Sequence, residues 1–541
     1  MQASKADHDG AVVLDSNKEI RVAVSDSPRA SPRASSISQV RFRPTSKPET
    51  EGLEEEEGTQ SPNKDGSSKM RRVRQETLTE KLYRYRGVVI VISIPIALIL
   101  FVLLTMPRVS VNEGLTSGGA AEDLFDRQAS KGGGGSSKLY SVVFDAGSSG
   151  SRVHVFCFDR NVDLVKMEDG ELELFEQIKP GLSNYSDDPK KGAKSLNGLL
   201  QKALDLVPKA LHSSTPVRLG ATAGLRMLPG NTADEILHEV RQLLHKSGFK
   251  FQDNWVSILD GANEGTYQWI TVNYLLGNLR KPFEETVGVV DLGGGSVQMS
   301  YAVSEEASKK APKPLEGRTS YIVQLQLLGQ EFNLYVYSYL RYGLYAVRSE
   351  ILKLVSKDAT CPCLLQGYEG SYVYGGEQFT AVADASGADV GGCKELVLQA
   401  LNKHETCTSL HCTFGGVWSG GGGSGQSNLL VASFFFDKAA EVGIIKDSKA
   451  ATAIVKPSQF EDAAKDVCGT SSEEVESKYP GIQASDRPYI CMDLLYEYVL
   501  LVDGFGVRPD QEIKLVKRVD YKGAEVEAAW ALGMAIQSVS S

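Results

Sequence analysis

The chain of 541 residues lacks features that several large protein classes require. Its 58 basic side chains are outnumbered by 68 acidic ones, for a net charge of -10, so there is no dense Lys and Arg field for general nucleic-acid binding. Its 53 glycines follow no three-residue period, and no heptad pattern runs along the chain. Collagen-like and coiled-coil classes are therefore excluded.

Familiar catalytic motifs are also missing. There is no G-x-x-x-x-G-K-[ST] phosphate loop and no G-x-S-x-G elbow, and the seven histidines form no evident relay. A G-x-G-x-x-G pattern at Gly420, Gly422 and Gly425 follows a glycine-rich tract rather than a strand, so it is a weak sign of a dinucleotide site. The chain offers no evident covalent nucleophile, which favours direct attack by water in any hydrolysis.

One long hydrophobic run is present, at residues 87–106 (GVVIVISIPIALILFVLLTM). A helix of this length spans about 30 Å, the thickness of the hydrocarbon core of a bilayer. The length of the run argues against a buried core helix, and its distance from the N-terminus argues against a cleaved signal peptide. Basic residues crowd before the run, whereas only Arg108 closely follows it; those before it are Arg71, Arg72, Arg74, Lys81, Arg84 and Arg86.

This charge asymmetry predicts a signal anchor with a cytosolic N-terminus. We therefore expect a single-pass type II membrane protein whose remainder faces the lumen or the cell exterior, in the Golgi or at the plasma membrane. Residues 1–86, rich in Ser, Pro and Arg, are typical of a disordered cytosolic tail, and residues 107–137 of a Gly- and Ser-rich stalk. From Leu139 onward strand and helix patterns alternate, which indicates an α/β architecture.

The cysteines agree with this sidedness. Seven of the eight lie beyond residue 360, namely Cys361, Cys363, Cys393, Cys407, Cys412, Cys468 and Cys491. An oxidising lumen would let them pair in disulfides and leave one free. A zinc site around His404, Cys407, His411 and Cys412 is the alternative, but it lacks paired C-x-x-C halves. Asn184-Tyr185-Ser186 is the one N-glycosylation sequon beyond the hydrophobic run.

Two glycine turns, 146 residues apart, share one plan. In residues 142–156 an apolar strand ends in Asp145, a turn of Gly and Ser follows, and a second strand leaves; residues 287–301 repeat this with Asp291. Such a repeat predicts two related lobes that face each other across a cleft. Glycine lets backbone N–H groups converge on a phosphate, and an aspartate at the strand end can hold a divalent cation.

Four sequence blocks carry a family resemblance: residues 145–152 (DAGSSGSR), 220–226 (GATAGLR), 260–269 (DGANEGTYQW) and 291–298 (DLGGGSVQ). In this order they resemble the characteristic blocks of the apyrases, the nucleoside triphosphate diphosphohydrolases. A fifth block, at residues 416–426 and 428–436, is similar to the plant branch of that family. The resemblance covers nearly all of residues 138–541.

The resemblance implies an actin-like (ribonuclease H-like) fold with the active site between two lobes. Lobe I would span residues 138–302, completed by a C-terminal helix at 523–541, and lobe II, with the disulfides, residues 303–522. It further implies hydrolysis of nucleoside tri- and diphosphates to the monophosphate, with Ca²⁺ or Mg²⁺ as cofactor. Three alternatives remain: a lumenal diphosphatase selective for GDP and UDP, another phosphotransferase of the actin-like group, and a non-catalytic nucleotide sensor.

Glu264 is the general base that the resemblance implies. Tyr267, Ile270 and Tyr274 follow it at helical spacing, so it would lie in the first turn of a helix that ends near Gly277. A helix N-terminus favours the ionised carboxylate, which must accept a proton from the attacking water. The alternative is that Glu264 only caps its helix.

Other roles also follow from the resemblance. Ser296 and Gln298 match residues that orient the attacking water, and Asp145 and Asp291 match those that anchor the cation through its water shell. The implied phosphate-binding residues are Gly147, Ser148, Ser149, Gly150, Arg152, Thr222, Ala223, Gly293, Gly294, Gly295 and Ser296.

Two assignments are less specific. Arg152 and Arg226 could each contact phosphate or instead pair with a structural carboxylate. For the nucleobase, the family stacks an aromatic side chain from the region of residues 434–436, where we select Phe435. Because stacking tolerates any base, we expect broad base specificity.

Overall fold

The computed structural model describes residues 138–313, 320–356, 359–409, 411–422, 424–447 and 449–540. The tail, hydrophobic run and stalk predicted at 1–86, 87–106 and 107–137 lie outside these ranges. None of the helices within them combines the length and the apolar character that a bilayer crossing needs.

The first sheet has the strand order β3-β2-β1-β4-β5. Its strands are β1 (Leu139–Ala146), β2 (Ser151–Phe158), β3 (Glu173–Ile178), β4 (Val217–Ala221) and β5 (Val256–Ile258). β1 pairs antiparallel with β2 and parallel with β4. β1 is buried on both faces, which explains why its sequence is almost continuously apolar.

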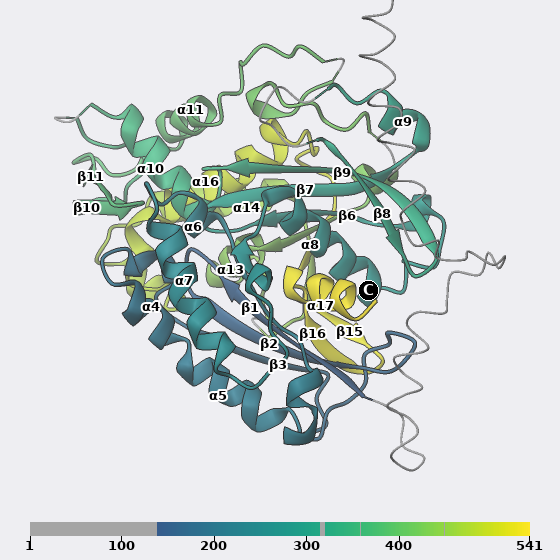
Figure 1. Cartoon of the computed structure of the whole chain (residues 1–541). Coiled ribbons are helices and arrows are strands. Elements are labelled where there is room, and N and C mark those ends of the chain that lie inside the picture. Colours follow the sequence, from purple (N-terminus) through teal and green to yellow (C-terminus); the bar gives the residue numbers. More distant parts are fainter. Residues whose placement is uncertain are drawn as a thin grey trace, which may run out of the picture. The chain divides into compact units, whose positions relative to one another are not determined.

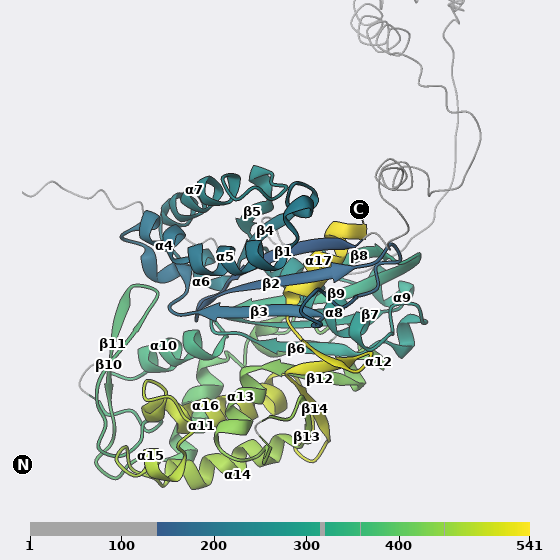
Figure 2. The same cartoon turned by 90° about the horizontal axis from the view of Figure 1, so that it is seen from below.

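Helices cover both faces of this sheet (Figures 1 and 2). Val142 and Phe144 belong to a core shared with helices α4 (Pro189–Ser195), α5 (Asn197–Leu206) and α7 (Thr232–His245). Val143 points the other way, into a core shared with α8 (Gly261–Leu275) and α17 (Trp530–Ser540). This alternation follows from the two-residue period of a strand.

The second sheet has seven strands in the order β13-β14-β12-β6-β7-β9-β8. They are β6 (Gly288–Leu292), β7 (Ser296–Val303), β8 (Ile322–Leu327), β9 (Gln330–Leu340), β12 (Leu429–Ser433), β13 (Thr452–Val455) and β14 (Ile513–Val516). β6 pairs antiparallel with β7 and parallel with β12. The centre of this sheet thus repeats the arrangement of β2, β1 and β4, as the paired turns predicted.

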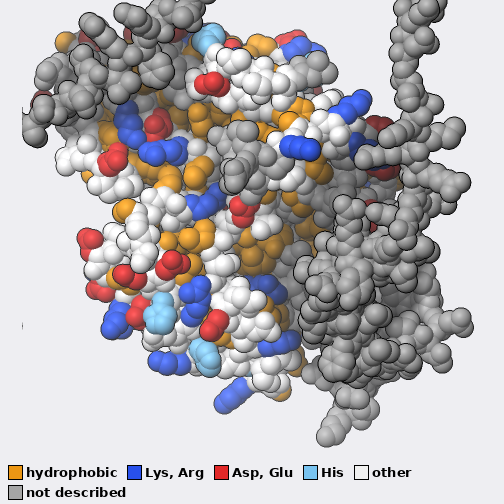
Figure 3. Space-filling model, turned by 45° about the horizontal axis from the view of Figure 1, so that its top comes forward, with side chains coloured by type: hydrophobic (Ala, Val, Ile, Leu, Met, Phe, Trp, Pro, Cys, Tyr) orange, Lys and Arg blue, Asp and Glu red, His pale blue; other side chains and the backbone are white. Residues whose placement is uncertain are grey.

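Helices α10 (Leu344–Leu354), α11 (Val390–Ala400), α13 (Phe434–Glu441), α14 (Pro457–Cys468) and α16 (Ile490–Val499) gather on the far side of the second sheet in Figure 2. α8 and α17 lie between the two sheets, in one hydrophobic core with side chains from both. A hairpin of β10 (Glu369–Tyr374) and β11 (Glu377–Val382) projects beyond α10. On the face shown in Figure 3, acidic and basic side chains are interspersed around hydrophobic ones.

Two predicted boundaries were wrong. The limit of lobe I at residue 302 would put β6 and β7 with the first sheet, but both strands belong to the second. The reason is that the second glycine turn is the central hairpin of its own sheet. The C-terminal helix begins at Trp530 rather than at residue 523, because residues 524–527 form strand β16 (Ala524–Glu527), which pairs with β15 (Arg518–Tyr521).

The predicted pairing of the cysteines is confirmed. Disulfides join Cys363 to Cys393, Cys407 to Cys412 and Cys468 to Cys491, the last connecting α14 to α16. Cys361 is the free and buried thiol of this group, and Cys157 is buried in β2. The zinc alternative is wrong, because Cys407 and Cys412 bind each other.

Candidate active site

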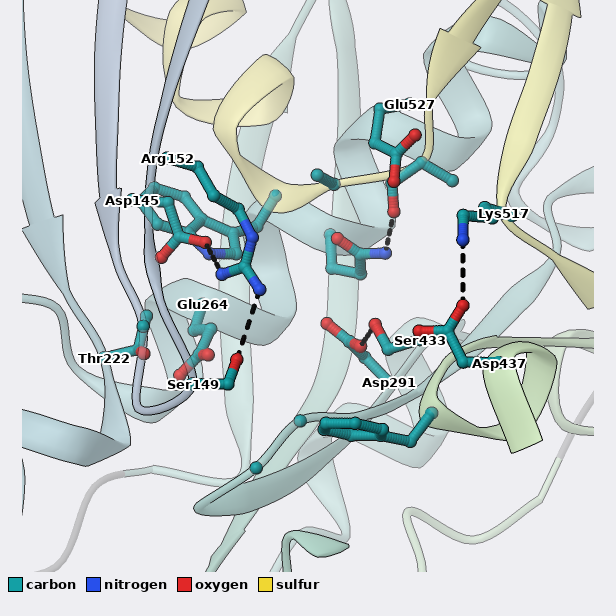
Figure 4. Close-up of a pocket in the computed structure, with 18 of the residues that line it drawn as sticks. Asp145, Ser149, Arg152, Thr222, Glu264, Asp291, Ser433, Asp437, Lys517 and Glu527 are labelled. Carbon is teal, nitrogen blue, oxygen red and sulfur yellow. Dashed lines mark hydrogen bonds and ion pairs between the residues drawn. The ribbon is translucent and has the colours of Figure 1, made fainter. Parts of the chain in front are cut away.

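The two glycine turns meet at a cavity of about 250 Å³ (Figure 4). The turn between β1 and β2 touches the turn between β6 and β7: a Cβ atom at Gly294 would lie 2.5 Å from the Ser148 hydroxyl oxygen. Any other residue at Gly294 would force the Ser148 hydroxyl to move. Of the predicted residues, those lining the cavity are Asp145, Gly147, Ser148, Ser149, Arg152, Thr222, Glu264, Asp291, Gly293 and Gly294.

Five of the predicted phosphate-binding and water-orienting residues are not among those that line the cavity, namely Gly150, Ala223, Gly295, Ser296 and Gln298. Ser296 and Gln298 are buried at the start of β7, beneath the second turn. The roles predicted for these residues, phosphate binding for the glycines, Ala223 and Ser296 and orientation of the attacking water for Ser296 and Gln298, stay predictions.

Glu264 lies in the first turn of α8, where the sequence predicted it, with a residue exposure of 7%. The alternative that it only caps the helix is wrong, since Asp260 is the N-cap and its carboxylate accepts from the N–H of Ala262. Glu264 Oε2 forms an ion pair with Arg226. Arg226 thus pairs with a carboxylate of the site rather than with a structural one.

Burial raises the pKa of Glu264 to about 7, and the negative charges of Asp291 and Asp145 add to the rise. Arg226 opposes it by favouring the ionised carboxylate. A carboxylate with a pKa near the working pH is suited to accept a proton from water.

An amide and a hydroxyl stand behind Glu264. Gln298 Nε2 lies 3.3 Å from Glu264 Oε2 and donates to Ser296 Oγ at 2.7 Å. It also donates, at 2.9 Å, to Ser338 Oγ on β9, a residue that no sequence motif indicated. The predicted trio of Glu264, Ser296 and Gln298 is therefore brought together, and a second serine belongs to it.

The two aspartates at the strand ends have different partners. Arg152 Nη1 donates to Asp145 Oδ2 at 2.8 Å, and its Nη2 donates to Ser149 Oγ at 3.3 Å. Ser433 Oγ donates to Asp291 Oδ1 at 2.5 Å. Burial raises the pKa of Asp291 to about 6; Asp145 adds to the rise and the bond from Ser433 opposes it.

This pair fits a divalent cation. Asp145 Oδ1 is buried and has no hydrogen-bond partner in the described part of the chain, and the Asp291 carboxylate is close enough for Asp145 to raise its pKa. The described residues include no cluster of three or more His, Cys, Asp or Glu side chains able to hold a metal. Two carboxylates with water and substrate oxygens as the remaining ligands are typical of Mg²⁺ bound with a nucleotide.

Phe435 is not the aromatic that reaches the cavity. It is fully buried and packs edge-on against Phe460, with ring centroids 6.2 Å apart. Phe434, the first residue of α13, lines the cavity instead and contacts the edge of Tyr345. Successive residues on a helix point in different directions, so only one of the three phenylalanines faces the ligand side.

Several cavity residues were missed because they lie far from the motifs. Trp530, at the start of α17, lines the cavity and packs on Gly220 of β4. Glu527 and Lys517 also line the cavity, and Lys517 forms an ion pair with Asp437 at 2.9 Å (Figure 4). No residue pattern around them pointed to a site; a C-terminal segment that returns to the first sheet was the only signal available.

A second, larger cavity of about 790 Å³ adjoins the first and shares Ser148 and Ser149 with it. Aromatic side chains from the second sheet's helices and hairpin line it, including Tyr345, Tyr372 and Tyr489. The guanidinium of Arg348 lies 4.9 Å from the ring centres of Tyr345 and Tyr489. The first glycine turn thus lines both a cavity rich in acidic residues and a cavity rich in aromatic ones.

Two lobes built on matching hairpins, with two glycine turns and a buried carboxylate between them, have the architecture of the actin-like hydrolases. The chain belongs to the GDA1/CD39 (nucleoside phosphatase) family, whose model matches residues 135–541. The resemblance to plant apyrases is thereby confirmed at the level of the family.

Two plant relatives agree with this family, and a solved structure agrees with the fold. The chain is 53% identical over 468 residues to probable apyrase 2 of Oryza sativa subsp. japonica, covering 86% of this chain and 97% of that protein. It is 53% identical over 406 residues to apyrase 1 of Arabidopsis thaliana, covering 75% of this chain and 86% of that protein. The crystal structure of nucleoside triphosphate hydrolases from Neospora caninum matches with a TM-score of 0.53 and 15% identity. The match covers 77% of this chain and 95% of that chain, which supports the fold.

Proposed function

We propose that this protein is an apyrase that hydrolyses nucleoside tri- and diphosphates to monophosphates. The observation that carries the proposal is the position of Glu264, buried at the wall of the cavity where the two phosphate turns meet, with a pKa near neutrality. The names of the relatives, apyrases among them, support the same substrate class.

In the proposed reaction Glu264 removes a proton from a water molecule as the water oxygen attacks the terminal phosphorus. A bond forms between this oxygen and phosphorus, and the bond from phosphorus to the bridging oxygen breaks, which releases the shortened nucleotide. Backbone N–H groups and hydroxyls of the two turns hold the phosphate oxygens, among them those of Ser148 and Ser149. Ser296 and Gln298 orient the attacking water relative to Glu264.

We propose that a divalent cation, Ca²⁺ or Mg²⁺, is held by Asp145 and Asp291, directly or through water. Bound there, it would offset the charge of the phosphates and stabilise the leaving group. The cation is needed because the substrates are polyanions and the catalytic part of the chain is itself acidic. Residues 1–86 hold 16 basic and 14 acidic side chains, so the remainder carries a net charge of -12.

We place the nucleoside toward the aromatic cavity, with Phe434 and Tyr345 as the candidate stacking surface. Both cavities touch Ser148 and Ser149, so a nucleotide whose phosphates occupy the turns can extend from one cavity into the other. Stacking on phenylalanine does not discriminate among bases. This geometry therefore supports broad base tolerance.

We further propose that the chain is a single-pass type II membrane protein whose residues 138–541 face the lumen or the cell exterior. The charge asymmetry around residues 87–106 supports the orientation. Three disulfides support an oxidising compartment.

The test of the activity is phosphate release by the purified full-length protein in detergent. ATP, ADP, GDP and UDP are compared with Ca²⁺, with Mg²⁺ and with a chelator. Release from both ATP and ADP, abolished by the chelator, supports the apyrase. Release from GDP and UDP alone would replace it with a lumenal diphosphatase, and absence of release from all four would overturn hydrolysis.

A further inference from the structure

Ser338 lies beside the catalytic trio although it is not on the cavity wall. It stands on β9 directly opposite Gln298 of β7 in the antiparallel pairing, so the two side chains share one face of the sheet. The Gln298 amide nitrogen donates to the Ser338 hydroxyl at 2.9 Å. Through Gln298, this contact links β9, which carries no predicted site residue, to Glu264.

Three oxygens compete for the two protons of the Gln298 amide. The hydroxyls of Ser296 and Ser338 are at 2.7 and 2.9 Å, whereas the Glu264 carboxylate is at 3.3 Å. The shorter distances give the protons to the serines. Glu264 therefore receives the longest and weakest of the three hydrogen bonds from the amide.

This distribution of protons matters for a general base. An N–H donated fully to a carboxylate stabilises its ionised form and makes it a weaker proton acceptor. The charged groups that face Glu264 are Arg226 from α6 (Ala223–Arg226) and, at longer range, Asp291 from β6 and Asp145 from β1. Ser338 carries no charge, so its hydroxyl acts on Glu264 through its hydrogen bond with Gln298 rather than by electrostatic attraction or repulsion.

Ser338 also fixes the start of α8. A Cβ atom at Gly261, the first residue of that helix, would lie 2.4 Å from the Ser338 hydroxyl oxygen. Strand and helix are thus in direct contact one turn before Glu264. The hydroxyl is held on one side by the helix and on the other by the amide.

We propose that Ser338 is a positioning residue for the hydrolysis: its hydroxyl holds the amide of Gln298 so that Nε2 donates mainly to the two serines and only weakly to Glu264, which leaves Oε1 to accept from the attacking water. The proposal rests on the proposed role of Glu264 as base.

The experiment is Ser338→Ala in the full-length protein, with kcat, KM and the pH profile of kcat measured at saturating cation. Without the Ser338 hydroxyl, Gln298 donates more strongly to Glu264. We expect kcat to fall about ten-fold, KM for ATP to stay within about two-fold, and the acid limb of the profile to move to lower pH. A merely structural role would lower the unfolding temperature without moving the limb.

Ser300→Ala is the matched control. Ser300 is a buried serine two residues along β7 on the same face as Gln298, and its pairing partner on β9 is Val336. We expect its kcat and pH profile to match those of the parent. Ser338→Ala with parental kcat and profile, or with a KM that rises as kcat falls, would overturn the positioning role. Glu264→Gln is assayed in parallel: retained turnover there would overturn the base itself, independently of Ser338.

Discussion

Arg226, the last residue of α6, forms an ion pair with Glu264 in the first turn of α8. The exposures of the two side chains are 14% and 10%, so water screens the pair only weakly. Burial raises the pKa of Glu264 to about 7, and Arg226 is the largest influence that lowers it. The pair therefore sets the pH range in which the base is ionised.

Replacement of Arg226 by methionine should move the pH dependence upward. Only ionised Glu264 accepts a proton, so kcat/KM of the parent should rise as pH increases through about 7. Arg226→Met removes the influence that lowers this pKa; the midpoint then moves to higher pH, with several-fold less activity at pH 7 and near-parental activity at pH 9. Profiles from pH 5 to 9 at saturating cation provide the check, and a midpoint that stays in place contradicts the pairing.

Loss of a strand-end aspartate should weaken the response to the cation. Asp291→Asn should raise the Mg²⁺ or Ca²⁺ concentration for half-maximal activity about ten-fold or more, because one of two carboxylates loses its charge. Asp437→Asn is the control, since Asp437 lines the same cavity but pairs with Lys517 at 2.9 Å. Cation titrations of phosphate release measure both. Equal shifts in the two variants would argue against a cation at Asp291.

The adjacent phenylalanines should respond in opposite ways. Phe434→Ala removes a candidate stacking surface and should raise KM about ten-fold, alike for purine and pyrimidine nucleotides, with little change in stability. Phe435→Ala opens a cavity in the core and should lower the free energy of unfolding by about 3–5 kcal/mol while leaving KM unchanged. Steady-state kinetics and denaturant unfolding of both variants separate the two roles. A KM effect confined to Phe435→Ala would reverse the assignment.

The sequon at Asn184 tests the sidedness of the chain. Asn184 and Ser186 are exposed on the wall of the aromatic cavity, accessible to an N-linked glycan. In a eukaryotic host the full-length protein should lose mass on treatment with an N-glycosidase, and Asn184→Gln should not. A parent chain that does not shift under this treatment would count against a lumenal domain, whatever the outcome of the activity assays.

Much of the site could be predicted because its residues lie in short local patterns. The turns at 145–152 and 291–298 can be recognised by their glycines and serines, which follow an aspartate at the end of a strand. The helical spacing after Glu264 predicts its place in α8. These are features of neighbouring residues, which a sequence shows directly.

The rest depends on contacts between distant segments. Ser338 meets Gln298 only through the pairing of β9 with β7, and Trp530 reaches the cavity only because α17 returns to the first sheet. Phe434 and Phe435 have the same chemistry in the sequence, and the direction in which α13 leaves β12 decides which one is buried. The boundary of lobe I failed for a related reason: β6 and β7 face α8 but pair with the second sheet.

Two glutamates in one cavity give the most direct test of the account. Burial raises the pKa of Glu264 and of Glu527 to about 7, but only Glu264 is hydrogen-bonded to Gln298, while Glu527 lies near Lys517 in Figure 4. The measurement is phosphate release from ATP by Glu264→Gln and by Glu527→Gln, with binding of cation and nucleotide measured on both. The account predicts that Glu264→Gln binds but does not turn over and that Glu527→Gln keeps its turnover. Sustained phosphate release by Glu264→Gln would contradict it.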